Sequence, residues 1–262
     1  MAKEIVDSCN CEFGYELISV IPYAYWLYLR GELESTISGK GSEPFYYFSP
    51  DHKINPEPRT WYNTPKMTTP NSDIHKPVLD LSRFVIPPYK ERYNNDKYHF
   101  DLIVYNRYNN EWPGVPELNR PINFFSLEFL RDLFRSFKGK ILYINISGLP
   151  DLYDNAPPLL FYDYPLCWEF QNVTVIHDLK EDFNTAQLMA MANCKLFLTT
   201  NGGGAILASF FGGKNIIYTN PQKVGDRIYP KENQTNDYGY YHLFSGSEII
   251  NVHTYQDIFK EL

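Results

Sequence analysis

A regular alternation of strand-like and helix-like segments runs from Phe100 to the carboxyl terminus. FDLIVYN, KILYINIS, NVTVIHD, KLFLTT, NIIYTN and EIINVH are short apolar runs that predict strands. SLEFLRDLFRSF, NTAQLMAMANC, GAILASFF and YQDIFKEL predict helices, and Ser126 is placed to cap the first of them. Strands that alternate with helices predict an α/β fold, with a parallel sheet covered by helices on both faces.

The amino-terminal part of the chain is less regular. KEIVDS, Lys3–Ser8, predicts a first strand, and an amphipathic helix is expected in Gly14–Gly31, where Pro22 either kinks it or starts it. PFYYFS, Pro44–Ser49, predicts a second strand. LSRFVIP, Leu81–Pro87, is the best strand candidate in a stretch rich in Pro, Asn, Thr and Lys.

A break in this pattern at PYKERYNNDKYH marks the expected domain boundary. We therefore expect one domain over residues 1–95 and a second over residues 96–262. The favoured architecture is two α/β halves that face each other across a cleft.

Composition narrows the class of protein. With 44% hydrophobic and 21% charged residues, the chain has the apolar material for real cores. A net charge of -7 argues against a nucleic-acid partner. No apolar run approaches roughly 18 residues and the amino terminus lacks a signal-peptide core, so we expect a cytoplasmic protein without an integral membrane segment. The 22 tyrosines and 18 phenylalanines suit sugar binding, or reflect codon bias alone.

The sequence TTNGGGAILASFFGG places three glycines between an expected strand and an expected helix. Ligands bind at the carboxyl ends of the strands in open parallel sheets, and a helix amino terminus there suits phosphate. Glycine lets the backbone approach the ligand. The pattern is neither a Walker loop nor a dinucleotide fingerprint, and a tight turn without a ligand would also explain it. The candidate binding residues are Asn201, Gly202, Gly203 and Gly204.

A second candidate segment, LIVYNRYNNEWPG, follows the strand that starts near Phe100. Asn106 and Arg107 fall where that strand should end, and the arginine could clamp a pyrophosphate. Tyr108 and Trp112 could stack on a base or a sugar, and Glu111 could bind hydroxyls. An arginine paired with a surface acid is the structural alternative.

The third segment, CNCEFGYEL, links the first strand to the first helix. Glu12 could face the cleft and act as a general base, with Phe13 and Gly14 beside the substrate. Glu16 could instead favour the first turn of the helix by complementing its dipole.

Metal-binding patterns are missing from the sequence. The six histidines lack helical metal-pair spacing, the four cysteines do not complete a zinc site, and no Asp-x-Asp pair occurs. Metal-dependent sugar transferases commonly hold their diphosphate through such a pair. No cofactor and no metal are therefore expected.

In layout, the three segments resemble GT-B glycosyltransferases, in particular the fucosyltransferase-like group that includes protein O-fucosyltransferases. EFGYE, Glu12–Glu16, stands where that group has an R-F-G-N-Q-like loop, and VYNR, Val104–Arg107, is similar to its H-I-R strand end. AMANCKLFLTTNGGGAILASFFG matches the helix, strand and small-residue turn near the end. Glu12, Tyr15 and Glu16 depart from the group's residues. The chain is short for this fold, so the resemblance implies a reduced amino-terminal domain.

The resemblance implies a metal-independent, inverting transfer of a sugar from a UDP- or GDP-sugar to a glycan hydroxyl. Arg107 and the backbone near Gly202 would hold the diphosphate, and Glu12 or Asp73 would be the base. Two alternatives stay open: a non-catalytic carbohydrate-binding protein, and an epimerase or hydrolase of nucleotide sugars on a Rossmann-like scaffold.

Overall fold

The computed structural model describes residues 3–9, 11–56, 69–71, 79–106, 124–145, 163–219, 222–224, 227–229, 241, 244 and 246–262. In this described part the chain divides into two compact units. Unit 1 comprises the residues up to Pro88, and unit 2 comprises the residues from Tyr89 onward.

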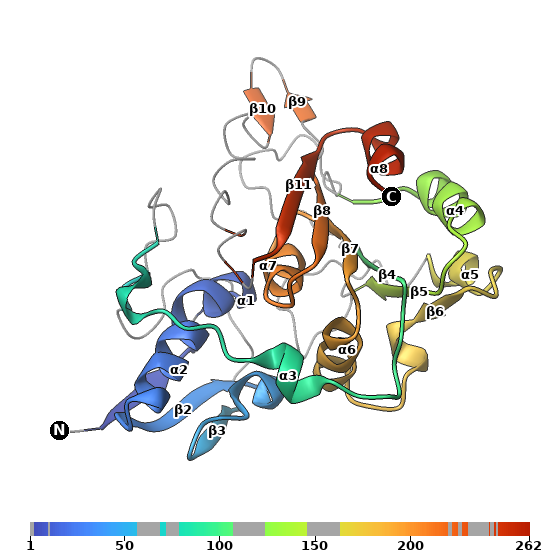
Figure 1. Ribbon diagram of the computed structural model, residues 1–262. Helices are drawn as coiled ribbons and strands as arrows, with labels where there is room; N and C mark the ends of the chain where they lie inside the picture. The colour runs from blue at the N-terminus through green and yellow to red at the C-terminus, as the bar shows by residue number, and fades with distance from the viewer. Residues whose placement is uncertain are drawn as a thin grey trace. The chain divides into compact units, whose positions relative to one another are not determined.

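Unit 1 is built on a three-stranded parallel sheet in the order β1-β2-β3. Its strands are β1 Glu4–Asp7, β2 Leu33–Gly39 and β3 His52–Asn55. Its helical segments are α1 Phe13–Tyr15, η1 Glu16–Val20, α2 Ile21–Leu29, η2 Glu43–Tyr46 and η3 Leu81–Arg83. The first three helical segments follow one another without a break and connect β1 to β2, as Figure 1 shows.

The expected helix changes from π-helical to α-helical geometry just before Pro22. Residues Glu16–Val20 are π-helical, and the N–H of Ile21 donates to the carbonyl of Glu16. Pro22 lies in the first turn of α2 and has no N–H to continue the α-helical pattern. The proline therefore starts a new α-helical segment, while the chain before it stays helical in a wider form.

Two strand predictions in unit 1 are wrong. Pro44–Ser49 forms no strand, because Pro44 lies in the first turn of the 3₁₀-helix Glu43–Tyr46 and the side chains of Phe45 and Tyr46 are buried. Leu81–Pro87 forms only the 3₁₀ turn Leu81–Arg83, which begins where the Asp80 carboxylate accepts from the N–H of Ser82.

Unit 2 contains a six-stranded sheet in which all neighbouring strands are parallel. Its strands are β4 Leu102–Asn106, β5 Ile141–Asn145, β6 Val173–Val175, β7 Leu196–Thr200, β8 Lys214–Tyr218 and β11 Glu248–Val252. They lie in the order β11-β8-β7-β4-β5-β6, which reads 6-5-4-1-2-3 by chain position. This is the doubly wound order of dinucleotide-binding domains. A separate hairpin pairs β9 Gln222–Val224 with β10 Arg227–Tyr229.

Helices cover both faces of the unit 2 sheet (Figure 1). The helices are α3 Tyr89–Tyr93, α4 Leu127–Ser136, α5 Tyr164–Cys167, α6 Phe183–Ala192, α7 Gly203–Ser209 and α8 Tyr255–Glu261, with the 3₁₀ turn η4 Ile176–Asp178. Helices α4, α5 and α8 share one apolar core with alternate residues of the strands. Helices α6 and α7 lie on the opposite face, and α3 packs on α6.

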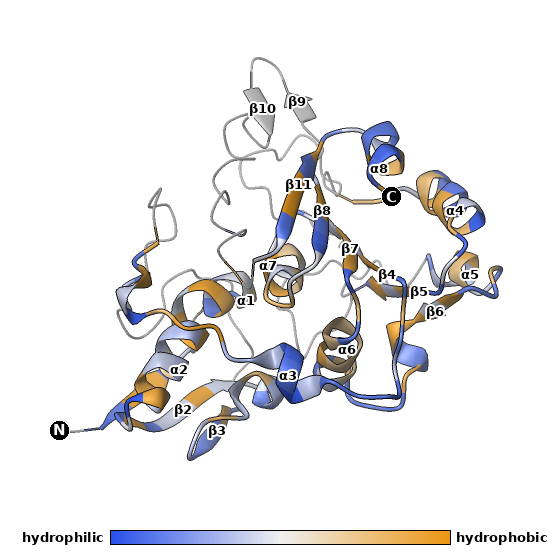
Figure 2. Ribbon diagram, viewed as in Figure 1, coloured by the Kyte–Doolittle hydropathy of each residue, from blue (hydrophilic) through white to orange (hydrophobic). Residues whose placement is uncertain are grey.

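Burial explains why these segments form this sheet. All residues of β4 and β5 are buried, which is typical of parallel strands covered on both faces. Helix α4 has one apolar and one polar side in Figure 2, and the hydroxyl of Ser126 caps it by accepting from the N–H of Phe129. The predicted α/β fold with a smaller amino-terminal part is confirmed, as are the predicted strands and helices after Phe100.

Candidate functional site

The sheet of unit 2 has a topological switch point between β4 and β7. These two strands are neighbours, and Tyr105 pairs in register with Thr199. After β4 the chain leads to α4 on one face, whereas after β7 it leads to α7 on the other face. Connections that leave in opposite directions open a crevice outside the carboxyl ends of the two strands, which is where such sheets bind ligands.

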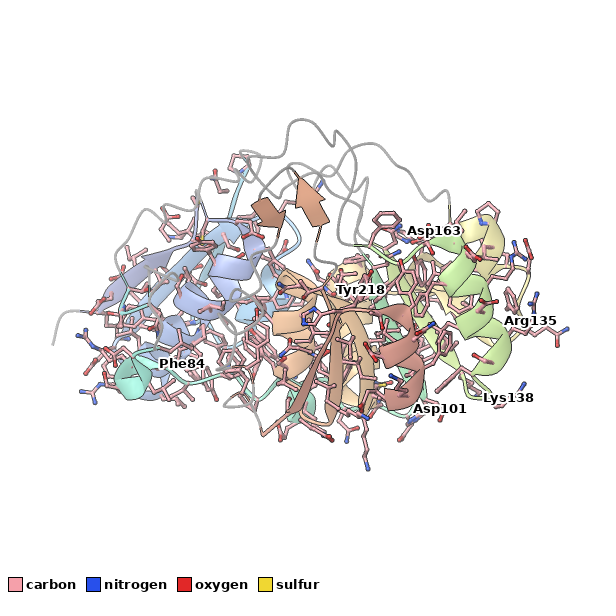
Figure 3. The ribbon with its side chains drawn as sticks, turned by 90° about the horizontal axis from the view of Figure 1, so that it is seen from above. Phe84, Asp101, Arg135, Lys138, Asp163 and Tyr218 are labelled. Atoms are coloured by element: carbon pink, nitrogen blue, oxygen red, sulfur yellow. The ribbon has the colours of Figure 1, made fainter. Side chains whose placement is uncertain are left out.

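The residues at this edge come from the ends of several strands. Asn106 ends β4, Thr200 ends β7, and Asn201 and Gly202 lead directly into α7. In Figure 3 the labelled Asp163 and Tyr218 lie toward this carboxyl edge, and Asp101 lies toward the opposite one. The predicted glycine segment therefore lies at the switch point of the sheet.

The glycines at this edge have different structural roles. Gly202 has φ 140° and ψ −162°, a backbone conformation that residues other than glycine rarely adopt. A Cβ on Gly204 would come within 2.4 Å of Cδ1 of Tyr105, so this glycine lets α7 pack closely on β4. Gly203 opens α7, whose first N–H groups point back toward the carboxyl edge.

Asn215 on β8 holds α7 against the sheet. Its Nδ2 donates to the carbonyl of Ala205 at 3.0 Å and to the hydroxyl of Ser209 at 3.0 Å. Its Oδ1 accepts from the hydroxyl of Thr199 at 3.0 Å. All of these side chains are buried, so the start of α7 is held in a fixed position relative to β7.

Asn106, a predicted binding residue, has a fully buried side chain. Its Oδ1 accepts from the N–H of Phe125 at 2.9 Å, and its Nδ2 donates to the carbonyl of Phe125 at 3.3 Å. The same Nδ2 donates to the hydroxyl of Tyr143 at 2.8 Å. The side chain is thus hydrogen-bonded to Phe125 and Tyr143 of the same unit.

Asp163 completes a buried polar network with these residues. Its Oδ2 accepts from the hydroxyl of Tyr143, and also from Nδ2 of Asn145 at 2.9 Å. Asn145 pairs in register with Asn106, so two asparagines end adjacent strands. The repeated endings VYN and YIN are the sequence feature that could have revealed this network, whereas nothing in the sequence marked Asp163.

Burial and the Asp163 carboxylate raise the pKa of two neighbouring groups. Burial, with a further contribution from Asp163, raises the pKa of the Tyr164 hydroxyl well above its usual range. The same two causes, in the same order, raise the pKa of the Cys167 thiol. His177, bonded through Nδ1 to the Tyr164 hydroxyl at 2.6 Å, has a pKa lowered by burial. These groups are therefore neutral near pH 7.

In unit 1 the predicted segment Glu12–Glu16 starts the first helix. Glu12 is half-buried and precedes α1, and its carbonyl accepts from the N–H of Glu16 at 2.9 Å. Phe13 is buried, with its ring centroid 5.1 Å from that of Phe45. Gly14 is buried within the first helical turn.

Glu16 is fully buried rather than placed on the helix surface. Its Oε1 accepts from the hydroxyls of Ser8 and Tyr46, each at 2.6 Å. The ring of Tyr46 stacks on His52 at 4.8 Å between centroids, and His52 bonds through Nδ1 to the hydroxyl of Thr36 at 2.7 Å. The carboxylate therefore ties the end of β1 to the segment before β3.

The other predicted site residues lie outside the described residues. They are Asp73, Arg107, Tyr108, Glu111 and Trp112. Their roles stay predictions.

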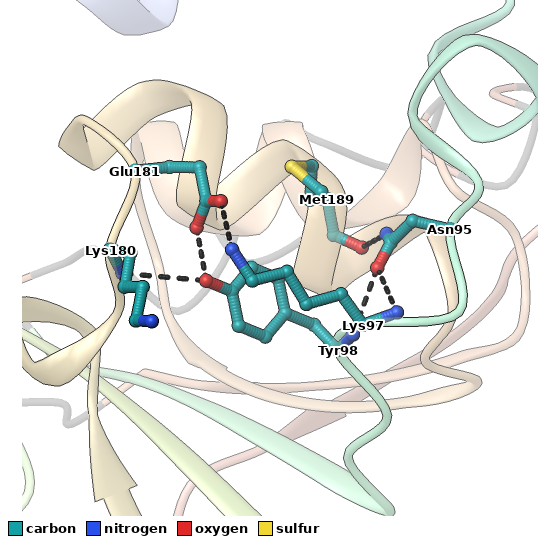
Figure 4. A network of polar contacts seen from close by, with 6 residues as sticks. All are labelled: Asn95, Lys97, Tyr98, Lys180, Glu181 and Met189. Atoms are coloured by element: carbon teal, nitrogen blue, oxygen red, sulfur yellow. Dashed lines mark hydrogen bonds and ion pairs between the residues drawn. The ribbon is translucent and has the colours of Figure 1, made fainter.

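A polar network and a hollow occupy the amino edge of unit 2, away from the switch point. Tyr98 donates its hydroxyl to Glu181, which also accepts from Nζ of Lys97, as Figure 4 shows. A hollow of about 480 Å³ is lined here by residues that include Lys97, His99 and Lys140. It offers a second polar surface, but on the edge where strands begin.

The described residues hold no group of three or more His, Cys, Asp or Glu side chains that could bind a metal ion. Within the same part of the chain, no helix has the length and apolarity needed to cross a membrane.

Comparisons with known proteins give one structural likeness to report. No protein-family model matches the chain, and no curated protein does. A glycosyl transferase of family 9 from Veillonella parvula DSM 2008 matches in structure, with 11% sequence identity and a TM-score of 0.48, over 99% of this chain and 88% of that one.

Proposed function

We propose that the chain is a glycosyltransferase, which moves a sugar from a nucleotide-diphosphate sugar to a glycan hydroxyl. The observation that carries this proposal is the glycine segment at the switch point of the unit 2 sheet. Gly202 has a backbone conformation that favours glycine, and Gly203 opens a helix that starts at the ligand-binding edge. Because glycine has no side chain, a diphosphate can approach the backbone closely at that edge.

Arg107 follows Asn106, the last residue of β4, and is the proposed partner of the diphosphate. In the reaction, the bond between the anomeric carbon and the phosphate oxygen breaks as the acceptor oxygen attacks that carbon. The phosphate leaves with the electron pair, and a cation stabilises its developing charge. A carboxylate, Glu12 or Asp73, takes the proton of the acceptor hydroxyl. Attack from the side opposite the leaving group inverts the anomeric centre.

The finer parts of the proposal rest on the sequence. The resemblance to the fucosyltransferase-like group depends on the segments Glu12–Glu16 and Val104–Arg107 and the glycine turn. Metal independence follows from the missing Asp-x-Asp pair, and a UDP- or GDP-sugar is the proposed donor.

A nucleotide screen tests the proposal first. Thermal unfolding is measured with UDP, GDP and CMP, and a ligand held at 100 times its dissociation constant stabilises the fold by roughly 2.7 kcal/mol. We expect UDP or GDP to stabilise the wild-type chain. Stabilisation by a free glycan, with none of the three nucleotides effective, would favour the carbohydrate-binding alternative.

Product analysis with a labelled nucleotide sugar separates transfer from other chemistry. A glycosyltransferase moves the label to the acceptor, whereas an epimerase leaves it on the nucleotide and a hydrolase releases free sugar. Arg107→Ala should lower transfer by about a hundredfold, comparable to the ~3 kcal/mol lost with one oxyanion-hole donor. Near-full activity of this variant would show that Arg107 does not bind the diphosphate.

A further inference from the structure

The buried network at the carboxyl edge of unit 2 joins the end of β4 to the start of α4. Asn106 ends β4, and Phe125 directly precedes Ser126, the residue that caps α4. The Asn106 side chain both accepts from and donates to the backbone of Phe125, at 2.9 Å and 3.3 Å. The end of β4 is therefore held against the residues that lead into α4.

A second bond of this kind lies at the neighbouring strand. Asn145 ends β5, and Asp163 directly precedes α5. Nδ2 of Asn145 donates to Oδ2 of Asp163 at 2.9 Å, and both side chains are fully buried. The end of β5 is thus joined to the start of α5 by one side-chain bond.

Tyr143 connects these two contacts. Its hydroxyl accepts from Nδ2 of Asn106 at 2.8 Å and donates to Oδ2 of Asp163. In this series of hydrogen bonds each group donates to the next, from the N–H of Phe125 to Asn106, from Asn106 to Tyr143, and from Tyr143 to the carboxylate of Asp163. Such a chain is cooperative, because each donor is polarised by the bond that it accepts.

We infer that Asn106, Tyr143, Asn145 and Asp163 form a positioning network, which fixes the ends of β4 and β5 against the starts of α4 and α5 at the ligand-binding edge. This inference rests on the proposed function, because it assigns the network a role in nucleotide binding at that edge. The four residues act through the backbone that they hold. Hydrogen bonds within a buried polar network favour one arrangement of the chain, and a site built on a rigid base binds without first ordering itself.

Tyr143→Phe tests this inference because it removes only the connecting hydroxyl. Tyr98→Phe is the matched control, since it too removes a tyrosine hydroxyl that donates to a carboxylate, but at the amino edge of the same sheet. Dissociation constants for UDP and GDP are measured by calorimetry for the wild type and both variants. Amide hydrogen exchange of Phe125 is measured without ligand.

We expect Tyr143→Phe to weaken binding of the nucleotide by about tenfold, which corresponds to ~1.4 kcal/mol, and Tyr98→Phe to leave it unchanged. Amide hydrogen exchange at Phe125 should become about tenfold faster in Tyr143→Phe and stay unchanged in Tyr98→Phe. The Phe125 N–H donates to Asn106, and in Tyr143→Phe the Asn106 side chain loses its hydrogen bond to the Tyr143 hydroxyl, worth ~1.4 kcal/mol. If Tyr143→Phe does not fold, Asn145→Ala, which keeps the Tyr143 bond, is expected to weaken nucleotide binding in the same direction.

Equal nucleotide affinity in the wild type and the folded network variant would overturn the inference, as would an equal loss in Tyr98→Phe. Unchanged exchange at Phe125 would also overturn it. A wild-type chain that binds neither UDP nor GDP contradicts the proposed function itself, and this role falls with it. The two failures are therefore distinguished by the wild-type measurement.

Discussion

At the scale of single residues, one glycine of the predicted binding segment is needed for packing. A Cβ added to Gly204 would meet three ring atoms of Tyr105, the nearest at 2.4 Å. Tyr105 is buried, so its ring cannot swing into solvent. Gly204 therefore sets the distance between α7 and β4, and Gly202 is the glycine whose backbone conformation itself favours glycine.

Gly204→Ala is expected to destabilise the fold by about 1–3 kcal/mol, the usual cost of overpacking a core. The measurement is urea unfolding of the variant and the wild type. The same substitution is also made in a Tyr105→Leu background. There Gly204→Ala should lower the free energy of unfolding by less, because the ring that the added Cβ would meet is absent. An equal cost in both backgrounds would mean that the ring is not the obstacle.

Glu16 shows a second residue-scale effect, since a buried carboxylate serves as the shared acceptor of two hydroxyls. Glu16→Ala leaves the hydroxyls of Ser8 and Tyr46 without this partner, and we expect unit 1 to lose about 1–3 kcal/mol of stability. Glu16→Gln keeps an acceptor oxygen and should cost less. Denaturant unfolding followed by tyrosine fluorescence gives both values, and an alanine variant as stable as the wild type contradicts the network.

At the scale of elements, Asn215 decides how α7 lies on the sheet. Asn215→Leu removes its bonds to Thr199, Ala205 and Ser209, and should cost about 1–3 kcal/mol because buried polar partners are left unpaired. Thr199→Val removes one of these bonds and should cost about 1 kcal/mol. Thermal unfolding measures both, and a larger cost for Thr199→Val would contradict the role given to Asn215.

The elements of unit 2 could be predicted because their strands are apolar and buried on both faces, as in LIVYN and ILYIN. The strands β2 and β3 were missed because their sequences, LESTISG and HKIN, are largely polar. Ser35, Thr36 and Ser38 are nevertheless buried in β2. The apolar run Pro44–Ser49 was mistaken for a strand, because hydrophobicity alone does not separate a strand from a packed 3₁₀ turn.

The candidate site was predictable in part for a similar reason. Glycines after an apolar strand indicate a sheet-edge turn, so Gly202–Gly204 could be found from sequence. Tyr143 lies within an apolar strand, and the sequence does not distinguish it from a residue of the hydrophobic core. Asp163 and Asn145 are far apart in the sequence and meet only in the folded chain. Contacts between residues far apart in the chain are not visible in local patterns.

At the scale of the whole molecule, two partly buried histidines make stability depend on pH. The pKa of His52 is lowered from 6.5 by burial, against the upward pull of Glu43, Glu16 and Asp51. The pKa of His177 is also lowered from 6.5 by burial, against the upward pull of Asp178. The folded chain therefore releases these protons at a lower pH than the unfolded chain does.

Between the lowered pKa values and about 6.5, the unfolded chain binds more protons, so the free energy of unfolding rises with pH. This stability is fully present above about pH 6.5 and is lost as the pH falls toward the folded pKa values. Urea unfolding across that range should show the slope, and His52→Asn with His177→Asn should flatten it. An unchanged slope in the double variant contradicts the assignment.

The central claim is that the carboxyl edge of the unit 2 sheet binds the diphosphate of a nucleotide sugar. The most direct test is a backbone amide NMR titration of the wild-type chain with UDP and with GDP. The account predicts that the largest shift changes fall at Asn201, Gly202 and Gly203. Changes confined to Lys97, His99 and Lys140 at the amino edge, or no change with either nucleotide, would contradict it.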